Sequence, residues 1–125
     1  MPENFSALTA GERGVMTLQA ILDQCQGLEL SEQRSSSTAY AELVFFNRDA
    51  AKWSKILSEA LGQPAKPAGT KPSRQDQELT QERGGINRDQ VLFCKDFDDA
   101  KVVAMLWPWQ DQQHTTLKLM SYAKA

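Results

Sequence analysis

The pattern of apolar and polar positions predicts two amphipathic helices. The first covers residues 9–26, because apolar residues there recur at the spacing of one helix face. Thr9 and Glu12 form a capping box at its start, and Gly27 is placed to end it in the left-handed conformation. The apolar face of this helix consists of Val15, Leu18, Ile21, Leu22 and Cys25.

The second predicted helix covers residues 48–61, RDAAKWSKILSEAL. Asn47 is a suitable N-cap, Gly62 suits the position after the last turn, and Pro64 cannot continue a helix. These start and stop signals bracket the most regular apolar stripe in the chain. The stripe consists of Ala50, Trp53, Ile56, Leu57, Ala60 and Leu61.

Further apolar runs predict strands. Residues 39–46, AYAELVFF, have apolar groups on both faces, which is typical of a central strand that is covered on both sides. The last part of the chain favours a β-meander, with tight turns at 98–99 and 110–113. The strands of this meander are expected at residues 90–97, 101–109 and 114–123.

Polar segments separate these elements. Residues 31–38, SEQRSSST, are serine-rich and predict a loop or the frayed start of a strand. Residues 63–74, QPAKPAGTKPSR, contain three prolines and predict an extended loop. Ser73 and Asp76 then favour a short helix over 74–83, which a glycine pair ends.

In chain order, these elements predict one α+β domain over residues 1–125: helix, strand, helix, loop with a short helix, then three strands. We expect a two-layer sandwich, with helices packed on a mostly antiparallel four-stranded sheet. The strand–helix–strand–strand–strand order over about residues 39–122 resembles the βαβββ unit of the vicinal-oxygen-chelate superfamily. A cone-shaped, cystatin-like or nuclear-transport-factor-2-like sheet fits the same elements.

The resemblance to the vicinal-oxygen-chelate superfamily does not extend to its metal chemistry. That superfamily usually pairs two such units and holds a metal with His and Glu ligands, whereas this chain has one unit and one histidine, His114. A structural zinc site needs three or four His or Cys ligands, and beyond His114 the chain offers only Cys25 and Cys94. We therefore expect no cofactor.

Composition narrows the class of protein. The formal net charge of −2 argues against a dedicated nucleic-acid binder, because such proteins bind mainly by neutralising phosphates. No window approaches the ~20 apolar residues of a membrane span, and residues 1–14 lack the pattern of a secretory signal. Cys25 and Cys94 fit two buried, reduced thiols. These features predict a cytoplasmic protein.

The stretch MLWPWQDQQH, residues 105–114, contains two of the three tryptophans and the histidine. On a strand over 101–109, Trp107 and Trp109 share one face. One interpretation is that Trp107 packs under a helix near Trp53 while Trp109 closes the rim of the core. The other is that Trp107, Trp109 and His114 line a ligand pocket or a dimer interface.

The proline-containing loop at 63–74 is the second candidate feature. It is either a plain connection or a lid that brings Lys66, Lys71 and Arg74 to a small anionic ligand or an acidic protein partner. Long loops in compact domains are uncommon and often functional, which keeps the second interpretation open. Lys71 and Arg74 therefore join Trp107, Trp109 and His114 as candidate binding or interface residues.

These observations favour a small cytosolic, non-enzymatic binding or assembly protein that forms a homodimer. Two small helices would leave apolar groups of the strands at 39–46 and 101–109 uncovered, and a second subunit would cover them. No catalytic motif occurs in the sequence. The alternative is a small-ligand-binding protein or enzyme, with a pocket between the Trp107/Trp109 face and the 63–74 loop.

Overall fold

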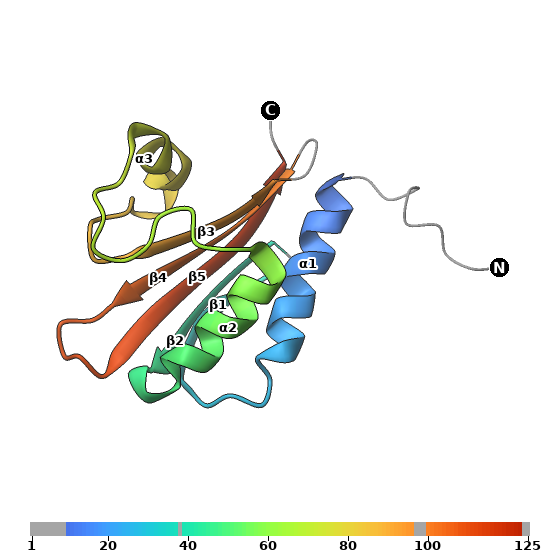
Figure 1. Cartoon of the computed structure of the whole chain (residues 1–125). Helices are drawn as coiled ribbons and strands as arrows, with labels where there is room; N and C mark the ends of the chain where they lie inside the picture. The colour runs from blue at the N-terminus through green and yellow to red at the C-terminus, as the bar shows by residue number, and fades with distance from the viewer. Residues whose placement is uncertain (1–9, 38, 97–99, 124–125) are drawn as a thin grey trace.

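The computed structural model describes residues 10–37, 39–96 and 100–123 of the 125-residue chain. They form three α-helices, two short 3₁₀ helices and a five-stranded sheet (Figure 1). In chain order the elements are α1 (Ala10–Gln24), β1 (Leu30–Ser36), β2 (Tyr40–Phe46), η2 (Asn47–Asp49), α2 (Ala50–Leu61), α3 (Arg74–Thr80), η3 (Gln81–Arg83), β3 (Val91–Asp96), β4 (Ala100–Pro108) and β5 (His114–Ala123).

The sheet has the order β1-β2-β5-β4-β3, and every pair of neighbours is antiparallel. This confirms the predicted α+β class and the strands at 39–46, 90–97, 101–109 and 114–123 within a residue at each end. The predicted number of four strands is wrong, because β1 adds a fifth at one edge. The middle of the sheet is formed by β5, which pairs with β2 on one side and with β4 on the other.

Strand β1 lies where the sequence predicts a loop or a frayed strand start. All seven of its residues are exposed, so no alternation of apolar and polar positions marks it in the sequence. It is held by backbone pairing with β2, from Leu30 opposite Phe45 to Ser36 opposite Ala41. Two register shifts, at Leu30/Glu32 and Gln33/Ser35, interrupt this pairing and mark β-bulges or local irregularities.

Helices α1 and α2 lie side by side on one face of the sheet, called here the inner face (Figure 1). Trp53 of α2 is fully buried and stacks on Phe45 of β2, with 4.8 Å between the ring centroids. Burial of each such large apolar side chain stabilises the fold by roughly 1.5–3 kcal/mol. The inner core also includes Leu18, Ile21, Leu57, Phe93, Val102, Ala104, Leu117 and Leu119.

The ends of the two long helices follow the sequence signals in part. The helix predicted at 48–61 is confirmed as η2 followed by α2, and Gly62 after it has a φ of +87°. The left-handed conformation predicted for Gly27 is wrong, because α1 ends at Gln24 and the Leu28 N–H then donates to the Cys25 carbonyl in a turn. Thr9 and the turn predicted at 98–99 lie outside the described residues.

The opposite, outer face of the sheet is partly covered by α3 and the chain that follows it. The predicted capping box is present, since the Asp76 N–H donates to Ser73 Oγ and the Ser73 N–H donates to the Asp76 carboxylate. A second core forms beneath this cover, with Leu79 and Ile86 packed on Val103, Met105, Leu92 and Met120. The expected two-layer arrangement therefore gains a partial third layer over β3 and β4.

The segment at 63–74 is pinned to the outer edge of β3. Lys66 pairs with Leu92, and the Leu92 N–H donates to the Lys66 carbonyl at 3.0 Å. The Lys66 ammonium is buried and donates to the carbonyls of Pro67, Arg88 and Gln90 at 2.6–2.9 Å. The prediction that Lys66 reaches toward an external anion is therefore wrong.

No helix among residues 10–37, 39–96 and 100–123 is long and apolar enough to cross a membrane.

Candidate functional site

Trp107 belongs to the second core and is not near Trp53. The two tryptophans lie on opposite faces of the sheet, so the predicted packing of Trp107 under a helix beside Trp53 is wrong. The Lys118 ammonium sits 3.4 Å from the centroid of the Trp107 ring system. A Cβ atom added to Gly84 would lie 2.4 Å from the Trp107 Cη2 atom. Lys118 and Gly84 thus enclose the indole and leave no room for a ligand against those atoms.

Trp109 and His114 meet at the β4–β5 hairpin. The Trp109 ring lies 4.9 Å from the His114 ring, and its Nε1–H donates to Thr116 Oγ1 at 2.8 Å. The Arg34 guanidinium of β1 covers the Trp109 ring at 5.3 Å. The Phe46 ring is a further neighbour of His114, at 5.3 Å. The sequence prediction that Trp109 and His114 lie together is consistent with this geometry.

Asp111 orients the His114 imidazole. Its carboxylate lies 2.5 Å from His114 Nδ1 and accepts the backbone N–H groups of Gln113 and His114. The Gln113 backbone bond and the His114 side chain lower the pKa of Asp111 below its ordinary value. Together the Nδ1 contact and the two backbone hydrogen bonds tie Gln113 and His114 to Asp111 and brace the turn.

Lys71 and Arg74 lie far along the chain from this hairpin and are exposed. The Arg74 side chain is 93% exposed and pairs with Glu78 one helical turn away at 3.2 Å. Exposed pairs of this kind contribute at most about 1 kcal/mol. The five residues predicted as one site are therefore divided among the Trp107 core, the β4–β5 hairpin and the surface around α3.

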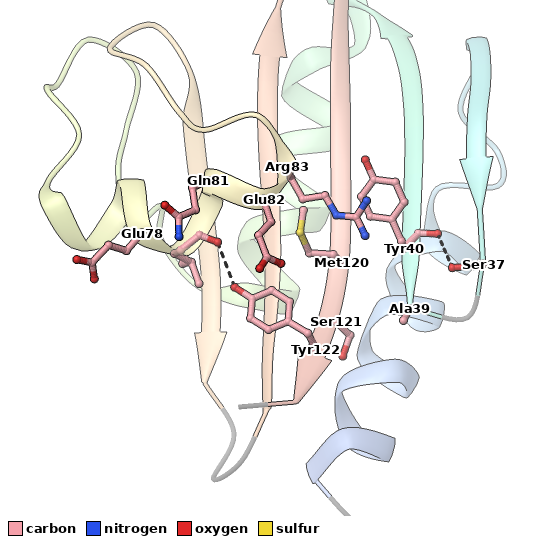
Figure 2. A pocket seen from close by; sticks show the side chains of 11 residues that line it. Ser37, Ala39, Tyr40, Glu78, Gln81, Glu82, Arg83, Met120, Ser121 and Tyr122 are labelled. Atoms are coloured by element: carbon pink, nitrogen blue, oxygen red, sulfur yellow. Dashed lines mark hydrogen bonds between the residues drawn. The ribbon is translucent and has the colours of Figure 1, made fainter. Parts of the chain in front are cut away.

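A groove on the outer face brings together residues that the sequence does not connect (Figure 2). It has a volume of about 550 Å³ and runs between the α3–η3 segment and the paired strands β2 and β5. We call it the η3 groove. Its lining residues are Ser37, Ala39, Tyr40, Glu78, Leu79, Gln81, Glu82, Arg83, Met120, Ser121 and Tyr122.

One wall of the η3 groove carries two opposite charges. The Arg83 guanidinium stacks on the Tyr40 ring at 3.9 Å, and the Glu82 carboxylate lies on the same side of η3, toward Tyr122 (Figure 2). Neither side chain makes a hydrogen bond or ion pair with another residue of the described ranges. Glu78, by contrast, points away from the Tyr40 and Met120 side chains and pairs with Arg74.

Two tyrosines and a methionine form the rest of the groove surface. The Tyr40 hydroxyl donates to the Glu42 carboxylate at 2.7 Å, and the Tyr122 hydroxyl reaches the Leu79 carbonyl at 3.4 Å. Burial, as the largest cause, raises the pKa of both hydroxyl groups to about 12, so both stay protonated at neutral pH. Met120 lies between the two rings and is almost fully buried.

A second groove, of about 510 Å³, lies on the other side of α3. Asp76, Glu78, Asp96 and Lys101 contribute its charges, and the half-buried Cys94 is part of its wall. Cys25 lies in the inner core, where burial raises the pKa of its thiol to about 11. Within the described part of the chain no three His, Cys, Asp or Glu side chains are grouped to hold a metal ion.

Comparison of the chain with family models, with curated proteins and with solved structures found no match.

Proposed function

We propose that the chain is a non-enzymatic binding protein, and that its ligand is a small zwitterion held in the η3 groove. The observation that carries this proposal is that Arg83 and Glu82, on one wall of the groove beside the two tyrosine rings, make no hydrogen bond or ion pair with another described residue. An amino acid or short peptide with an apolar side chain has the matching chemistry: a carboxylate, an ammonium and an apolar body.

The ligand's carboxylate is assigned to Arg83. A guanidinium presents its donors in a planar fork that fits a carboxylate with two parallel hydrogen bonds. Stacking on Tyr40 already fixes the plane of this guanidinium, so less side-chain freedom is lost when the ligand binds.

Glu82 is assigned to the ammonium group and the tyrosine–methionine surface to the apolar body. The groove volume of about 550 Å³ lies within the range of roughly 300–1,000 Å³ that is usual for small-molecule sites. The exposed Tyr122 ring, backed by the nearly buried Met120, supplies an apolar surface of the kind that such sites use to bury the non-polar part of a ligand.

The proposal keeps the predicted class of protein but changes the predicted ligand site. A non-enzymatic binding protein is retained, while the ligand site moves from the Trp107/Trp109 face to the η3 groove. The pocket predicted between that face and the 63–74 loop has less support, because Gly84 and Lys118 already contact the Trp107 indole. Lys71, expected to meet an anion, does not line the η3 groove.

Calorimetric titration with three matched probes tests the assignment. Phenylalanine carries both charges, 3-phenylpropanoate only the carboxylate, and 2-phenylethylamine only the ammonium. We expect phenylalanine to bind more tightly than either analogue. Arg83→Gln should weaken binding of phenylalanine and 3-phenylpropanoate by about tenfold or more, because at least one of the two charge-assisted hydrogen bonds is lost, and should not weaken 2-phenylethylamine. Glu82→Gln should show the reverse selectivity.

Lys71→Gln is the matched control, because it removes one exposed positive charge outside the groove. It should leave all three affinities unchanged. The proposal is wrong if phenylalanine shows no advantage over the singly charged analogues, or if Lys71→Gln weakens binding as much as Arg83→Gln does.

A further inference from the structure

Strand β1 is the one strand of the described sheet that is exposed along its whole length. Its residues bury neither face, and β2 is its only strand neighbour in the described ranges. The opposite edge differs, because the Lys66 segment pairs with β3 there. An open edge presents backbone N–H and C=O groups that a further strand can pair with.

The apolar faces do not supply the dimer interface that the sequence suggested. The apolar groups on both faces of β2 and β4, such as Val44 and Met105, are fully buried within the single chain. Tyr122, Leu30 and Met16 are the large hydrophobic residues of the described ranges that are exposed. A homodimer would therefore need a different interface, and the open edge of β1 is a candidate.

We infer that two copies of this chain associate through antiparallel pairing of their β1 strands, with a twofold axis at Gln33. In that register Gln33 faces Gln33 of the second copy, and the two five-stranded sheets continue into one another. A twofold interface brings each residue opposite its symmetry partner on the other chain. Glu32 of each copy then faces Arg34 of the other.

This register is selected by charge. Glu32 and Arg34 both lie on the outer face, where Arg34 contacts the Trp109 ring and the Glu42 carboxylate. Within one chain the Arg34 Nε lies 3.4 Å from the Glu32 carboxylate, and their side chains are still 40% and 51% exposed, so both remain accessible to a second copy. A twofold axis at Glu32 would oppose two carboxylates, and one at Arg34 would oppose two guanidinium groups. Only the axis at Gln33 gives two favourable cross-strand pairs.

The same features discourage pairing with unrelated strands. Charged side chains and register shifts on an edge strand are typical devices against indiscriminate edge-to-edge association. Strand β1 has both, at Glu32, Arg34 and the two shifts in its register with β2. A second copy of the same strand is a partner with which each Glu32 and Arg34 can exchange its contact within the chain for a contact across the twofold axis.

Sedimentation velocity over a range of protein concentrations tests this inference. We expect the wild-type protein to shift from monomer to dimer as its concentration rises. Glu32→Arg and Arg34→Glu should each remain monomeric, because each opposes like charges at the axis. An equimolar mixture of these two variants should dimerise, because the basic strand of one then faces the acidic strand of the other.

Lys55→Glu, an exposed charge reversal on α2, should dimerise like the wild-type protein. Circular dichroism should show that every variant is folded. Hydrogen exchange gives an independent measurement, since amides of residues 30–36 should gain protection on dimerisation. A wild-type protein that stays monomeric at millimolar concentration, or a dimer that persists in both single variants, would overturn the inference.

Discussion

Gly84 shows how one residue connects the α3–η3 segment to the sheet. Its φ of +101° lies in a region that other residues occupy only with strain, and a side chain there would collide with Trp107. The glycine thus allows η3 to end directly against the indole, with the groove residues Glu82 and Arg83 immediately before it. The sequence predicted this glycine as a helix-ending residue, but not the indole beside it.

Gly84→Ala should destabilise the protein by roughly 2–4 kcal/mol, the sum of backbone strain and overpacking. Chemical denaturation measures the change in the free energy of unfolding.

Two other glycines separate these contributions. Gly62 has a φ of +87° and no atom near its missing Cβ, so Gly62→Ala should cost only the strain, roughly 1–2 kcal/mol. Gly27 has neither feature, and Gly27→Ala should be neutral or slightly stabilising. An equal loss for Gly62→Ala and Gly84→Ala would show that the Trp107 contact contributes nothing.

At the scale of elements, α2 and β1 differ in how far the sequence predicts them. Helix α2 buries one stripe, so its apolar residues recur at helical spacing, and the Gly62 N–H donates to the Ser58 carbonyl at its end. The N-cap predicted at Asn47 is wrong, because the Asn47 side-chain oxygen accepts from the Thr115 hydroxyl instead. Strand β1 buries nothing, and its pairing with β2 is a backbone interaction that leaves no periodic pattern in the side chains. The Lys66–Leu92 bridge to β3 is also a backbone interaction, so the proline-rich sequence around Lys66 does not predict it.

Lys66→Met tests whether the buried ammonium stabilises the β3 edge. The variant keeps an apolar chain of similar length but leaves three carbonyl oxygens without their donor. We expect a loss of about 1–3 kcal/mol in the free energy of unfolding. Lys71→Met, at an exposed position, should stay within about 0.5 kcal/mol of wild type. A more stable Lys66→Met protein would mean that desolvation of the charge outweighs its hydrogen bonds.

The β4–β5 hairpin should have a pH-dependent stability that originates at Asp111. The folded state lowers the pKa of Asp111 below its ordinary value of 3.8, so this stabilisation is present above that value. It is lost as the pH falls through the lower pKa of the folded state.

Asp111→Asn keeps a side-chain oxygen for the backbone N–H groups and removes the titrating charge. Thermal unfolding should show the wild-type protein to be more stable than Asp111→Asn at neutral pH. The difference should shrink when the pH is lowered below the folded-state pKa of Asp111. A difference that does not change with pH would contradict the role assigned to the carboxylate.

At the scale of the whole molecule, the η3 groove depends on three distant segments. Residues 37, 39–40, 78–83 and 120–122 meet because β2 pairs with β5 and the α3–η3 segment folds back across the outer face. Local periodicity predicts elements, but not which strands become neighbours, so the groove could not be predicted from the sequence. The contact between Trp109 and His114 could be predicted from the sequence, because the two residues flank one short turn.

The measurement that tests the central claim most directly is amide chemical-shift mapping of the isotope-labelled protein during titration with phenylalanine. The proposed site predicts shifts concentrated at residues 37, 39–40, 79–83 and 120–122, and their loss at the same ligand concentration in Arg83→Gln. No shifts, or shifts confined to the 107–114 hairpin or to Lys71 and Arg74, would contradict the assignment of the η3 groove as the ligand site.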